Sequence, residues 1–169
     1  GSILNPRPRA PVRARLLPSY RVVNAVMQAL GQAVPERVIA PGFDTTSVSC
    51  LSHKADGGYN IYLEIFGGGF GAGPNHDGCD AVDSMLSNCS NIPIEAMESD
   101  YPFFRVVDYS LRSSSGGDGK FRGGMGFQKV YQILMDNVTF ATYGDRFRIA
   151  PKGVLGGAPG AKAETFVER

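Results

Sequence analysis

The sequence YNIYLEIFGGGFGAG, residues 59–73, decides the fold of this chain. Its first part, residues 59–66, is rich in aromatic and branched side chains with partial alternation, which predicts a β-strand. The strand runs directly into a glycine-rich loop. Glycine loses more conformational freedom on folding than any other residue, so a dense cluster is expected only where the backbone turns sharply, packs closely or approaches a ligand. The glycine-rich loops are therefore the first place to look for function.

Three more segments carry the same strand signal: residues 103–112, 126–135 and 138–144. Asp136 and Asn137 supply turn chemistry between the last two segments, which predicts a hairpin. Residues 38–52 alternate weakly and contain Pro41-Gly42, a pattern typical of a loop that leads into a short strand. Strands separated by turns, with one helix in front of them, favour an α+β fold built mainly on antiparallel sheet with long glycine-rich loops.

The N-terminal part of the chain divides into an arm and a helix. Residues 1–18 contain four prolines, which fix the backbone and favour extended geometry, so we expect an extended arm. Residues 19–34 show the spacing of an amphipathic helix, with Ser19 placed to cap its start and Pro35 to end it. Its apolar positions are Val23, Val26, Met27, Leu30 and Val34. After the arm we expect a single β-rich domain over residues 19–169.

Composition excludes several classes of protein. With 17 basic and 16 acidic residues, the net charge of +1 gives no overall field that would draw the chain to nucleic acid or to an anionic membrane. The three cysteines include no C-x-x-C pair, which argues against a disulfide framework and a structural zinc site. No segment offers the roughly 20 continuous apolar residues that span a bilayer. We predict a cytoplasmic protein without nucleic-acid or membrane partners.

Two glycine patterns match nucleotide-binding motifs only in part. Residues 67–72 satisfy the spacing of a dinucleotide fingerprint, but residues 71–74 read Gly-Ala-Gly-Pro and do not open the helix that must receive the pyrophosphate. Residues 119–120 read Gly-Lys but are followed by Phe121 instead of the Ser or Thr of a P-loop. We therefore predict no cofactor-binding site and no metal site within this chain.

One candidate for acid–base chemistry is a histidine that adjoins a carboxylate in the glycine-rich stretch. His76 and Asp77 stand together there, and such a pair can shuttle protons or bind a metal. The alternative is a solvated turn, because Asp77-Gly78 is also turn chemistry. The second histidine, His53, has no ligand spacing around it and is expected at the surface.

A second candidate is a cluster of carboxylates in residues 95–100. Glu95 and Glu98 would share one face of a helical turn, and the pair could divide into acid and base if one member were buried. The alternative is a structural role, with Arg112 and Arg122 as ion-pair partners. The sequence contains no Ser-His-Asp set, H-E-x-x-H helix or calcium-loop pattern.

The loops also contain an ordered series of blocks that matches a known family. The blocks include Asn5-Pro6-x-Pro8, Pro35-Glu36-Arg37-Val38, Gly67-Gly68, Asp77-Gly78, Asn91-x-Pro93-Ile94-Glu95-x-x-Glu98-x-x-Tyr101-Pro102, Ser115-Gly116-Gly117-x-Gly119, Arg122-Gly123-Gly124-x-Gly126 and Pro151-x-Gly153-x-x-Gly156-Gly157. Their order and number make the match specific, and it covers essentially the whole chain. The chain resembles the hydantoinase B / 5-oxoprolinase family, and looks like only a C-terminal-side part of a full member.

The resemblance implies a function that the residues alone do not. Members of the family act with a partner subunit, or a fused half, of the hydantoinase A type. They use ATP, with a divalent metal, to open cyclic amides such as hydantoins and 5-oxoproline. The resemblance thus implies a parent hydrolase that is an oligomer, whose partners for this chain are the A-type subunit and the remainder of the B-type subunit.

The same resemblance limits what this part does alone. It implies that the fragment binds no cofactor itself, contributes scaffold and interface, and is inactive by itself. Two alternatives stay open. The parent can be a component of an ATP-dependent ketone carboxylase, since carboxylase relatives activate ketones, or the chain can be a non-catalytic assembly module.

Within the matched blocks, the resemblance indicates organisers of loops and interfaces. They are Gly67, Gly68, Gly69, Asp77, Asn91, Glu95, Glu98 and Arg122. His76, Asp77 and Glu98 are the catalytic candidates, with no role as acid, base or nucleophile assigned. The sequence departs from the family at Ser114, where the family commonly has Asp before Ser-Gly-Gly. We expect Ser114 to replace that acid as a turn residue.

Overall fold

The computed structural model describes residues 2, 4–10, 16–55, 57–82 and 92–168. This part of the chain forms two α-helices, a short 3-10 helix and five β-strands. In order these are α1 (Leu16–Leu30), η1 (Pro35–Arg37), β1 (Ser47–Ala55), β2 (Gly58–Phe66), α2 (Ile94–Asp100), β3 (Phe104–Leu111), β4 (Phe127–Ile133) and β5 (Val138–Tyr143). Neither of the α-helices in these ranges is long and apolar enough to cross a membrane.

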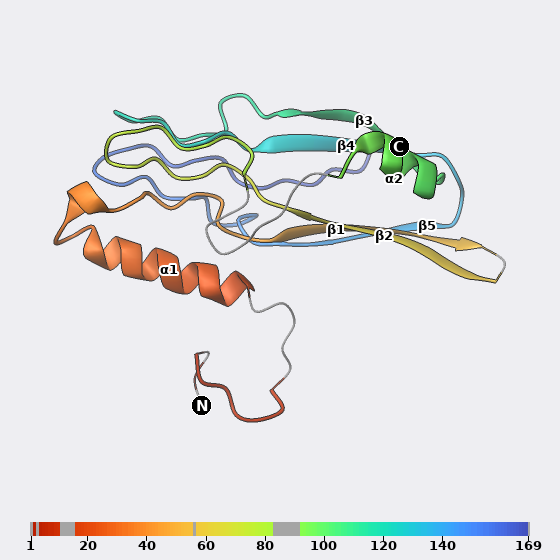
Figure 1. The fold of residues 1–169 in the computed structure, drawn as a ribbon, viewed down its shortest axis with the longest axis horizontal. Helices are drawn as coiled ribbons and strands as arrows, with labels where there is room; N and C mark the ends of the chain where they lie inside the picture. Colours follow the sequence, from red (N-terminus) through yellow and green to blue (C-terminus); the bar gives the residue numbers. More distant parts are fainter. Residues whose placement is uncertain (1, 3, 11–15, 56, 83–91, 169) are drawn as a thin grey trace.

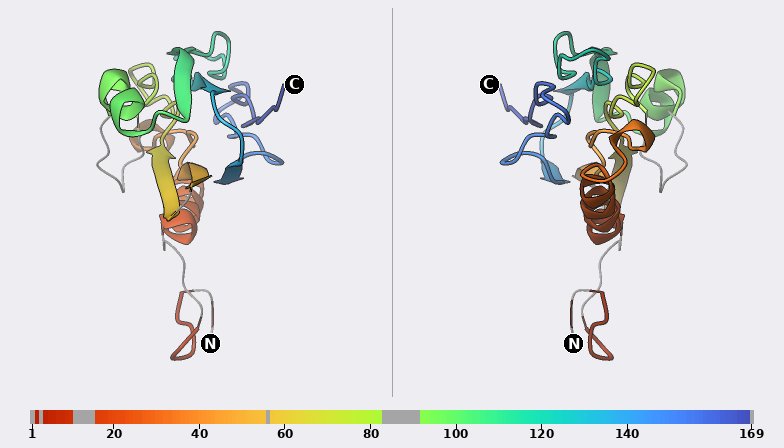
Figure 2. Two further views of the ribbon diagram at one scale, coloured as in Figure 1. Left: turned by 90° about the vertical axis from the view of Figure 1, so that its right-hand side faces the viewer. Right: turned by 90° about the vertical axis from the view of Figure 1, so that its left-hand side faces the viewer.

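Two antiparallel sheets form the body of the molecule. The larger has the strand order β2-β1-β5, and the smaller pairs β3 with β4. Figure 1 shows the sheets one above the other, with α2 at one end and the glycine-rich loops at the other. In the views of Figure 2, α1 lies on the opposite side of the larger sheet from β3. The prediction of an α+β fold built mainly on antiparallel sheet is confirmed.

The predicted hairpin between residues 126–135 and 138–144 is wrong. β4 pairs with β3, whereas β5 pairs with β1 in the other sheet. Asn137 does adopt turn geometry, with a φ of 57°. The turn here carries the chain from one sheet to the other (Figure 1). A turn residue fixes a local bend, but the partner of each strand depends on which side-chain faces are buried together.

Helix α1 is shifted towards the N-terminus relative to its prediction. It begins at Leu16, so the predicted capping residue Ser19 lies inside the helix, which takes in the end of the predicted arm. It ends at Leu30, and Pro35 begins the 3-10 helix instead of ending α1. Proline suits the first position of a helix, where its missing N–H is not needed.

The buried face of α1 is more polar than its sequence predicts. Val26 and Leu30, expected on the apolar face, are 50% and 45% exposed, whereas Asn24 is buried. With its amide oriented to suit its neighbours, Asn24 donates to the Asp44 carboxylate at 3.1 Å and accepts from the Arg146 guanidinium at 3.3 Å. Buried polar groups require such partners, and this contact, with the buried Tyr20 one turn earlier, marks the face of α1 that turns inward.

Sequence analysis does not predict α2, the second α-helix of the described chain. Its seven residues, Ile94–Asp100, follow Pro93, and the N–H of Tyr101 donates to the carbonyl of Met97 at 2.9 Å at its end. About two turns are too few for an apolar period to be recognised. Strand β1 also continues to Ala55, past the short strand expected within residues 38–52.

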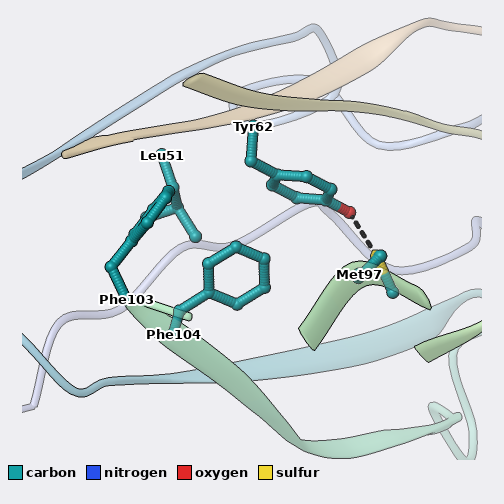
Figure 3. Close-up of a cluster of buried hydrophobic side chains, with 5 residues drawn as sticks. All are labelled: Leu51, Tyr62, Met97, Phe103 and Phe104. Carbon is teal, nitrogen blue, oxygen red and sulfur yellow. Dashed lines mark hydrogen bonds between the residues drawn. The ribbon is translucent and has the colours of Figure 1, made fainter. Parts of the chain in front are cut away.

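The apolar core lies between the sheets at the α2 end (Figure 3). It comprises Leu51 from β1, Tyr62 from β2, Met97 from α2, and Phe103 and Phe104 at the start of β3. Figure 3 shows the Tyr62 hydroxyl directed at the Met97 sulfur, 2.7 Å away. His53, expected at the surface, is half-buried and stacks on Phe103 with 5.5 Å between ring centroids. Alternation along β1 turns His53 to the same side as Leu51, which explains the difference.

Candidate functional site

Two glycine-rich loops, residues 67–82 and 112–126, lie side by side at the end of the molecule opposite α2 (Figure 1). The N–H of Gly124 donates to the carbonyl of Phe70 at 2.8 Å, and the N–H of Phe70 donates to that of Cys79 at 2.9 Å. A Cβ added at Gly124 would overlap the Cys79 carbonyl. Glycine at this position therefore serves the close packing of one backbone against another.

The predicted organisers Gly67, Gly68 and Gly69 lie where the chain leaves β2. A Cβ at Gly68 would collide with the Phe43 ring, and one at Gly69 would overlap the carbonyl of Gly124. Gly67 lines the cleft between the two sheets. Two of the three positions thus have no room for a side chain, and the atoms that occupy the space belong to the protein itself.

Arg122 joins the two loops through its side chain and its backbone. Its guanidinium forms a bidentate pair with Asp80, at 2.7 and 3.1 Å, and its N–H donates to the Asp77 carboxylate at 2.9 Å. The hydrogen bond from Arg122, followed by one from the Met125 backbone, holds the pKa of Asp80 below its ordinary value. The structure thus brings Asp77 and Arg122 together. Sequence analysis missed Asp80, whose signal was a second carboxylate three residues after Asp77.

His76 closes a turn in the first of these loops. Its Nδ1 lies 2.8 Å from the backbone oxygen of Asp77, and its own backbone oxygen accepts from the N–H of Gly73 at 3.0 Å. A Cβ at Gly73 would strike the imidazole ring. The imidazole therefore contacts the backbone of Asp77, while the Asp77 carboxylate contacts Arg122. These contacts do not join the two candidate side chains to each other.

The carboxylates of residues 95–100 lie on α2, at the other end of the molecule (Figure 1). Glu98 accepts a hydrogen bond from the N–H of Val106 at 2.8 Å, which ties α2 to β3. Glu95 is exposed. The remaining organiser, Asn91, lies outside the described residues. The structure therefore does not bring Glu95 and Glu98 to the residues that organise the glycine-rich loops.

The arginines expected to pair with these carboxylates have other partners, so that prediction is wrong. Arg112 pairs with Glu164 at 2.9 Å and donates to the backbone oxygen of Lys162 at 2.9 Å. Arg122 pairs with Asp80. Both arginines belong to the loop that follows β3, at the opposite end of the molecule from α2, which puts the α2 carboxylates out of their reach.

A cleft of about 1180 Å³ lies between the two sheets. Ser49 and Phe66 line it from the larger sheet, and Lys129 and Tyr131 line it from the smaller one. The glycine-rich loops and the C-terminal residues 160–168 complete its walls. A concave surface of this size is where a ligand site is expected, so the polar groups on its walls are the candidates for chemistry.

A buried ion pair joins the two sheets beside this cleft. Lys129 Nζ lies 2.8 and 2.7 Å from the two carboxylate oxygens of Glu64. The side chains of Lys129 and Glu64 are only 3% and 6% exposed. Glu64 stands on the inward face of β2 and Lys129 belongs to β4, so each sheet contributes one charge. A buried charge persists when it is paired and hydrogen-bonded in this way.

Hydroxyl groups and aromatic rings surround the pair. The hydroxyls of Tyr62 and Tyr131 both donate to Glu64, the second at 2.9 Å. Burial, followed by the influence of Glu64, raises the pKa of both tyrosines well above its ordinary value, so they remain protonated donors. The Lys129 ammonium lies 4.7 Å from the centre of the Tyr109 ring, in an attractive cation–π arrangement.

Sequence analysis did not identify this pair. A signal was present, because Glu64 is a charged residue inside an apolar strand, where charge is rare unless it is paired. Its partner Lys129 is 65 residues away along the chain. The Glu64 carboxylate accepts hydrogen bonds from Lys129 and two tyrosine hydroxyls, and the Lys129 ammonium is bound to that carboxylate. The pair can therefore hold the two sheets in register, but it presents no free acid or base to the cleft. Within the described residues, no group of three or more His, Cys, Asp or Glu side chains is placed to hold a metal ion.

Comparison with known proteins places the chain among relatives. The profile of the hydantoinase B/oxoprolinase family matches residues 1–169. A protein of Pseudomonas sp. (strain NS671) that is named as the B-type subunit of a D-/L-hydantoinase is 37% identical over 160 residues, or 95% of this chain and 26% of that protein. A 5-oxoprolinase of Dictyostelium discoideum is 36% identical over 159 residues, or 93% of this chain and 12% of that protein.

Among solved structures, a nucleotide-free acetone carboxylase is similar over 79% of this chain and 18% of that chain, with a TM-score of 0.59. At 22% identity this likeness concerns the fold alone. The chain spans about a quarter of the length of the hydantoinase subunit and about an eighth of that of the 5-oxoprolinase. The family profile nevertheless covers it from end to end, and both relatives align with more than nine tenths of it. The chain belongs to the hydantoinase B/oxoprolinase family.

Proposed function

We propose that this chain is part of the B-type subunit of an ATP-dependent cyclic amidohydrolase. The enzyme opens a hydantoin or 5-oxoproline ring together with an A-type partner subunit or fused half. Within it, the chain supplies scaffold and interface and is inactive by itself. The observation that carries the proposal is the family match over all 169 residues, together with relatives named as a hydantoinase subunit and a 5-oxoprolinase.

The scaffold role is supported by what the polar residues of the matched blocks do. Arg122 binds Asp77 and Asp80 and so fastens one glycine-rich loop to the other. Glu98 binds the N–H of Val106 and fastens α2 to β3. These side chains form hydrogen bonds that hold parts of the fold together, which is the expected role of polar side chains in a scaffold.

An unactivated amide is a poor electrophile, and ATP makes ring opening feasible by phosphorylating the amide oxygen. Two observations on the described residues support placing the nucleotide and the divalent metal elsewhere in the enzyme. The positions that would cradle a phosphate, such as Gly69 and Gly124, face neighbouring backbone. The described side chains also form no cluster suited to a metal ion. We therefore assign ATP, the metal and the reacting groups to the rest of the oligomeric enzyme, and derive no chemical step from these residues.

The test is a ring-opening assay on three samples: the 169-residue chain alone, the B-type subunit that contains it, and that subunit with its A-type partner. ATP hydrolysis and ring-opened product are measured with hydantoin and with 5-oxoproline. We expect product only from the third sample. Product from the chain alone would refute the scaffold role. A complete enzyme that opens neither ring would refute the substrate class.

Ketone carboxylation is the competing function, and the fold likeness to acetone carboxylase is the observation in its favour. The same three samples, given acetone and bicarbonate, distinguish it from ring opening. Bicarbonate-dependent ATP turnover with the ketone, and none with either ring, would replace the proposed reaction. A non-catalytic assembly module predicts no turnover in any sample and a stable complex with the partner in light scattering.

A further inference from the structure

The outward face of β2 carries an uninterrupted row of exposed apolar side chains. Alternation along the strand turns Tyr62 and Glu64 inward, towards the other sheet, and turns the residues between and beside them outward. The outward residues are Tyr59, Ile61, Leu63 and Ile65, which are 65%, 54%, 51% and 41% exposed. We call these four residues the β2 outer row.

The β2 outer row lies at the edge of a sheet. In the order β2-β1-β5, the second long side of β2 has no neighbouring strand among the described residues. The strands extend past α1, so the helix does not lie beneath most of their length (Figure 1). Proteins protect exposed edges with charged side chains or proline, because an unprotected edge invites pairing with other chains. The β2 outer row contains neither.

The smaller sheet shows how this protein builds a face that meets solvent. On the outward side of β3 and β4, Arg105 donates to Gln132 at 2.7 Å and Ser110 donates to Asp108 at 3.1 Å. Apolar side chains are exposed on these strands too, among them Val107 and Val130 at 52% and 45%, but they stand among polar side chains, which is normal for a soluble surface. A contiguous apolar patch is not normal for a soluble surface, and it marks a surface that another structure covers.

We propose that the β2 outer row is covered by an apolar layer from the part of the B-type subunit that lies outside these 169 residues. This inference rests on the proposed function, in which the chain belongs to a longer subunit. The related hydantoinase subunit aligns with 95% of this chain but with 26% of its own length, so about three quarters of such a subunit is available to supply the layer. Because the row carries no charge, the covering face is itself apolar and uncharged.

Cysteine labelling at the row tests the inference. Leu63→Cys places a thiol on the β2 outer row, and Gln132→Cys places one on the polar outward face of β4 as a matched control. Reaction with a maleimide is measured for each site by peptide mass spectrometry, so other cysteines do not interfere. The rates are compared in the isolated chain, in the B-type subunit that contains it, and in that subunit with its A-type partner.

We expect the Leu63→Cys thiol to react roughly tenfold or more slowly in the longer subunit than in the isolated chain, with little change at Gln132→Cys. Equal rates in the two samples would overturn the inference. So would protection that appears only when the A-type partner is added, which would assign the row to that partner. Protection in the isolated chain that grows with concentration would assign it to a second copy, with the same consequence. Labelling requires no turnover, so its failure is distinct from a failure of the ring-opening assay.

A second pair of variants keeps the inference testable if the new thiol disturbs folding. Leu63→Lys puts a charge against the covering layer, whereas Leu63→Met keeps the position apolar. In the longer subunit, we expect the lysine variant to lower the melting temperature and the soluble yield, and the methionine variant to behave as the native protein. In the isolated chain neither should change the melting temperature, because the side chain is half exposed there. A lysine tolerated equally in both samples would contradict the inference.

Discussion

Lys129→Met removes the positive half of the buried ion pair while keeping a side chain of similar shape. The Glu64 carboxylate, 6% exposed, then keeps only the hydroxyls of Tyr62 and Tyr131 as side-chain donors. Removing one partner of a buried pair costs about 3–5 kcal/mol, since an uncompensated charge stays behind. Because two hydroxyl donors remain, we expect the lower end of that range, a loss of about 3 kcal/mol in the free energy of unfolding.

Urea unfolding followed by far-ultraviolet circular dichroism measures this loss, since the chain contains no tryptophan. With a slope of about 2 kcal/mol per molar urea, a loss of about 3 kcal/mol lowers the unfolding midpoint by roughly 1.5 M. The control is Lys120→Met, the same change at an exposed lysine whose ammonium lies 5.5 Å from the centre of the Phe121 ring. Its midpoint should move by less than about 0.3 M.

A double variant, Lys129→Met with Glu64→Gln, separates the pair from its surroundings. Once both charges are gone, the amide oxygen still accepts from a tyrosine hydroxyl, and neutral replacements of buried pairs often cost little. We expect the double variant to lose about 1 kcal/mol, less than either single variant. A Lys129→Met midpoint equal to that of Lys120→Met, or a double variant that loses as much as the two single variants together, would refute the reasoning.

The glycine-rich loops supply three further predictions. Gly124→Ala should cost at least about 2 kcal/mol in urea unfolding, because the new Cβ would strike a backbone carbonyl, and Gly126→Ala, where the nearest atom would be 3.7 Å away, under about 1 kcal/mol. Equal losses would contradict close backbone packing. Arg122 lowers the pKa of Asp80 below 3.8, so the stabilisation is present above that pH and is lost as the pH falls through the folded-state value. Acid unfolding of Asp80→Asn should therefore lose stability less steeply below pH 3.8 than the native protein, and identical curves would argue against the pair. Ser114 has a φ of 59°, so Ser114→Asp should leave the stability of the chain and ring opening by the complete enzyme unchanged, whereas Ser114→Val should lose about 1 kcal/mol of stability. A gain of ring opening in Ser114→Asp would show that the missing acid takes part in chemistry.

The strands could be predicted from sequence because alternation and residue type are local properties of a segment. β2 occupies Gly58–Phe66, nearly the predicted range. The partner of each strand could not be predicted in the same way. Asn137 does bend the chain, but whether the next strand returns to its predecessor depends on which inward faces bury together, and that involves segments far apart in sequence. The prediction of a turn at Asn137 is therefore confirmed, whereas the prediction of a hairpin between the two strands is wrong.

The same distinction applies to the candidate site. Asp77 and Arg122 were named because their blocks resemble those of a family, and the structure joins them directly through a hydrogen bond from the Arg122 N–H. Asp80, which the sequence analysis did not name, pairs with the Arg122 guanidinium. Glu64 stands out as a charge inside an apolar strand, but nothing in its own segment identifies Lys129, and only the stacking of one sheet on the other makes them partners. Contacts between residues 65 positions apart leave no trace in the periodicity of either segment.

The two ends of the molecule are held together by different kinds of contact, and this bears on how the fold can serve a larger enzyme. At the α2 end, buried side chains fill the space between the sheets, so shifted rotamers can take up part of the strain of a longer side chain, at a cost of about 1–3 kcal/mol. At the loop end, backbone lies against backbone around Gly69 and Gly124, and no rotamer change can relieve an added atom. The loop end is therefore closely packed, and Arg122 links its two loops. Under the proposed function, close packing at the loop end gives a defined shape and the uncharged β2 outer row gives a face that gains from being covered, and docking against another part of a subunit requires both.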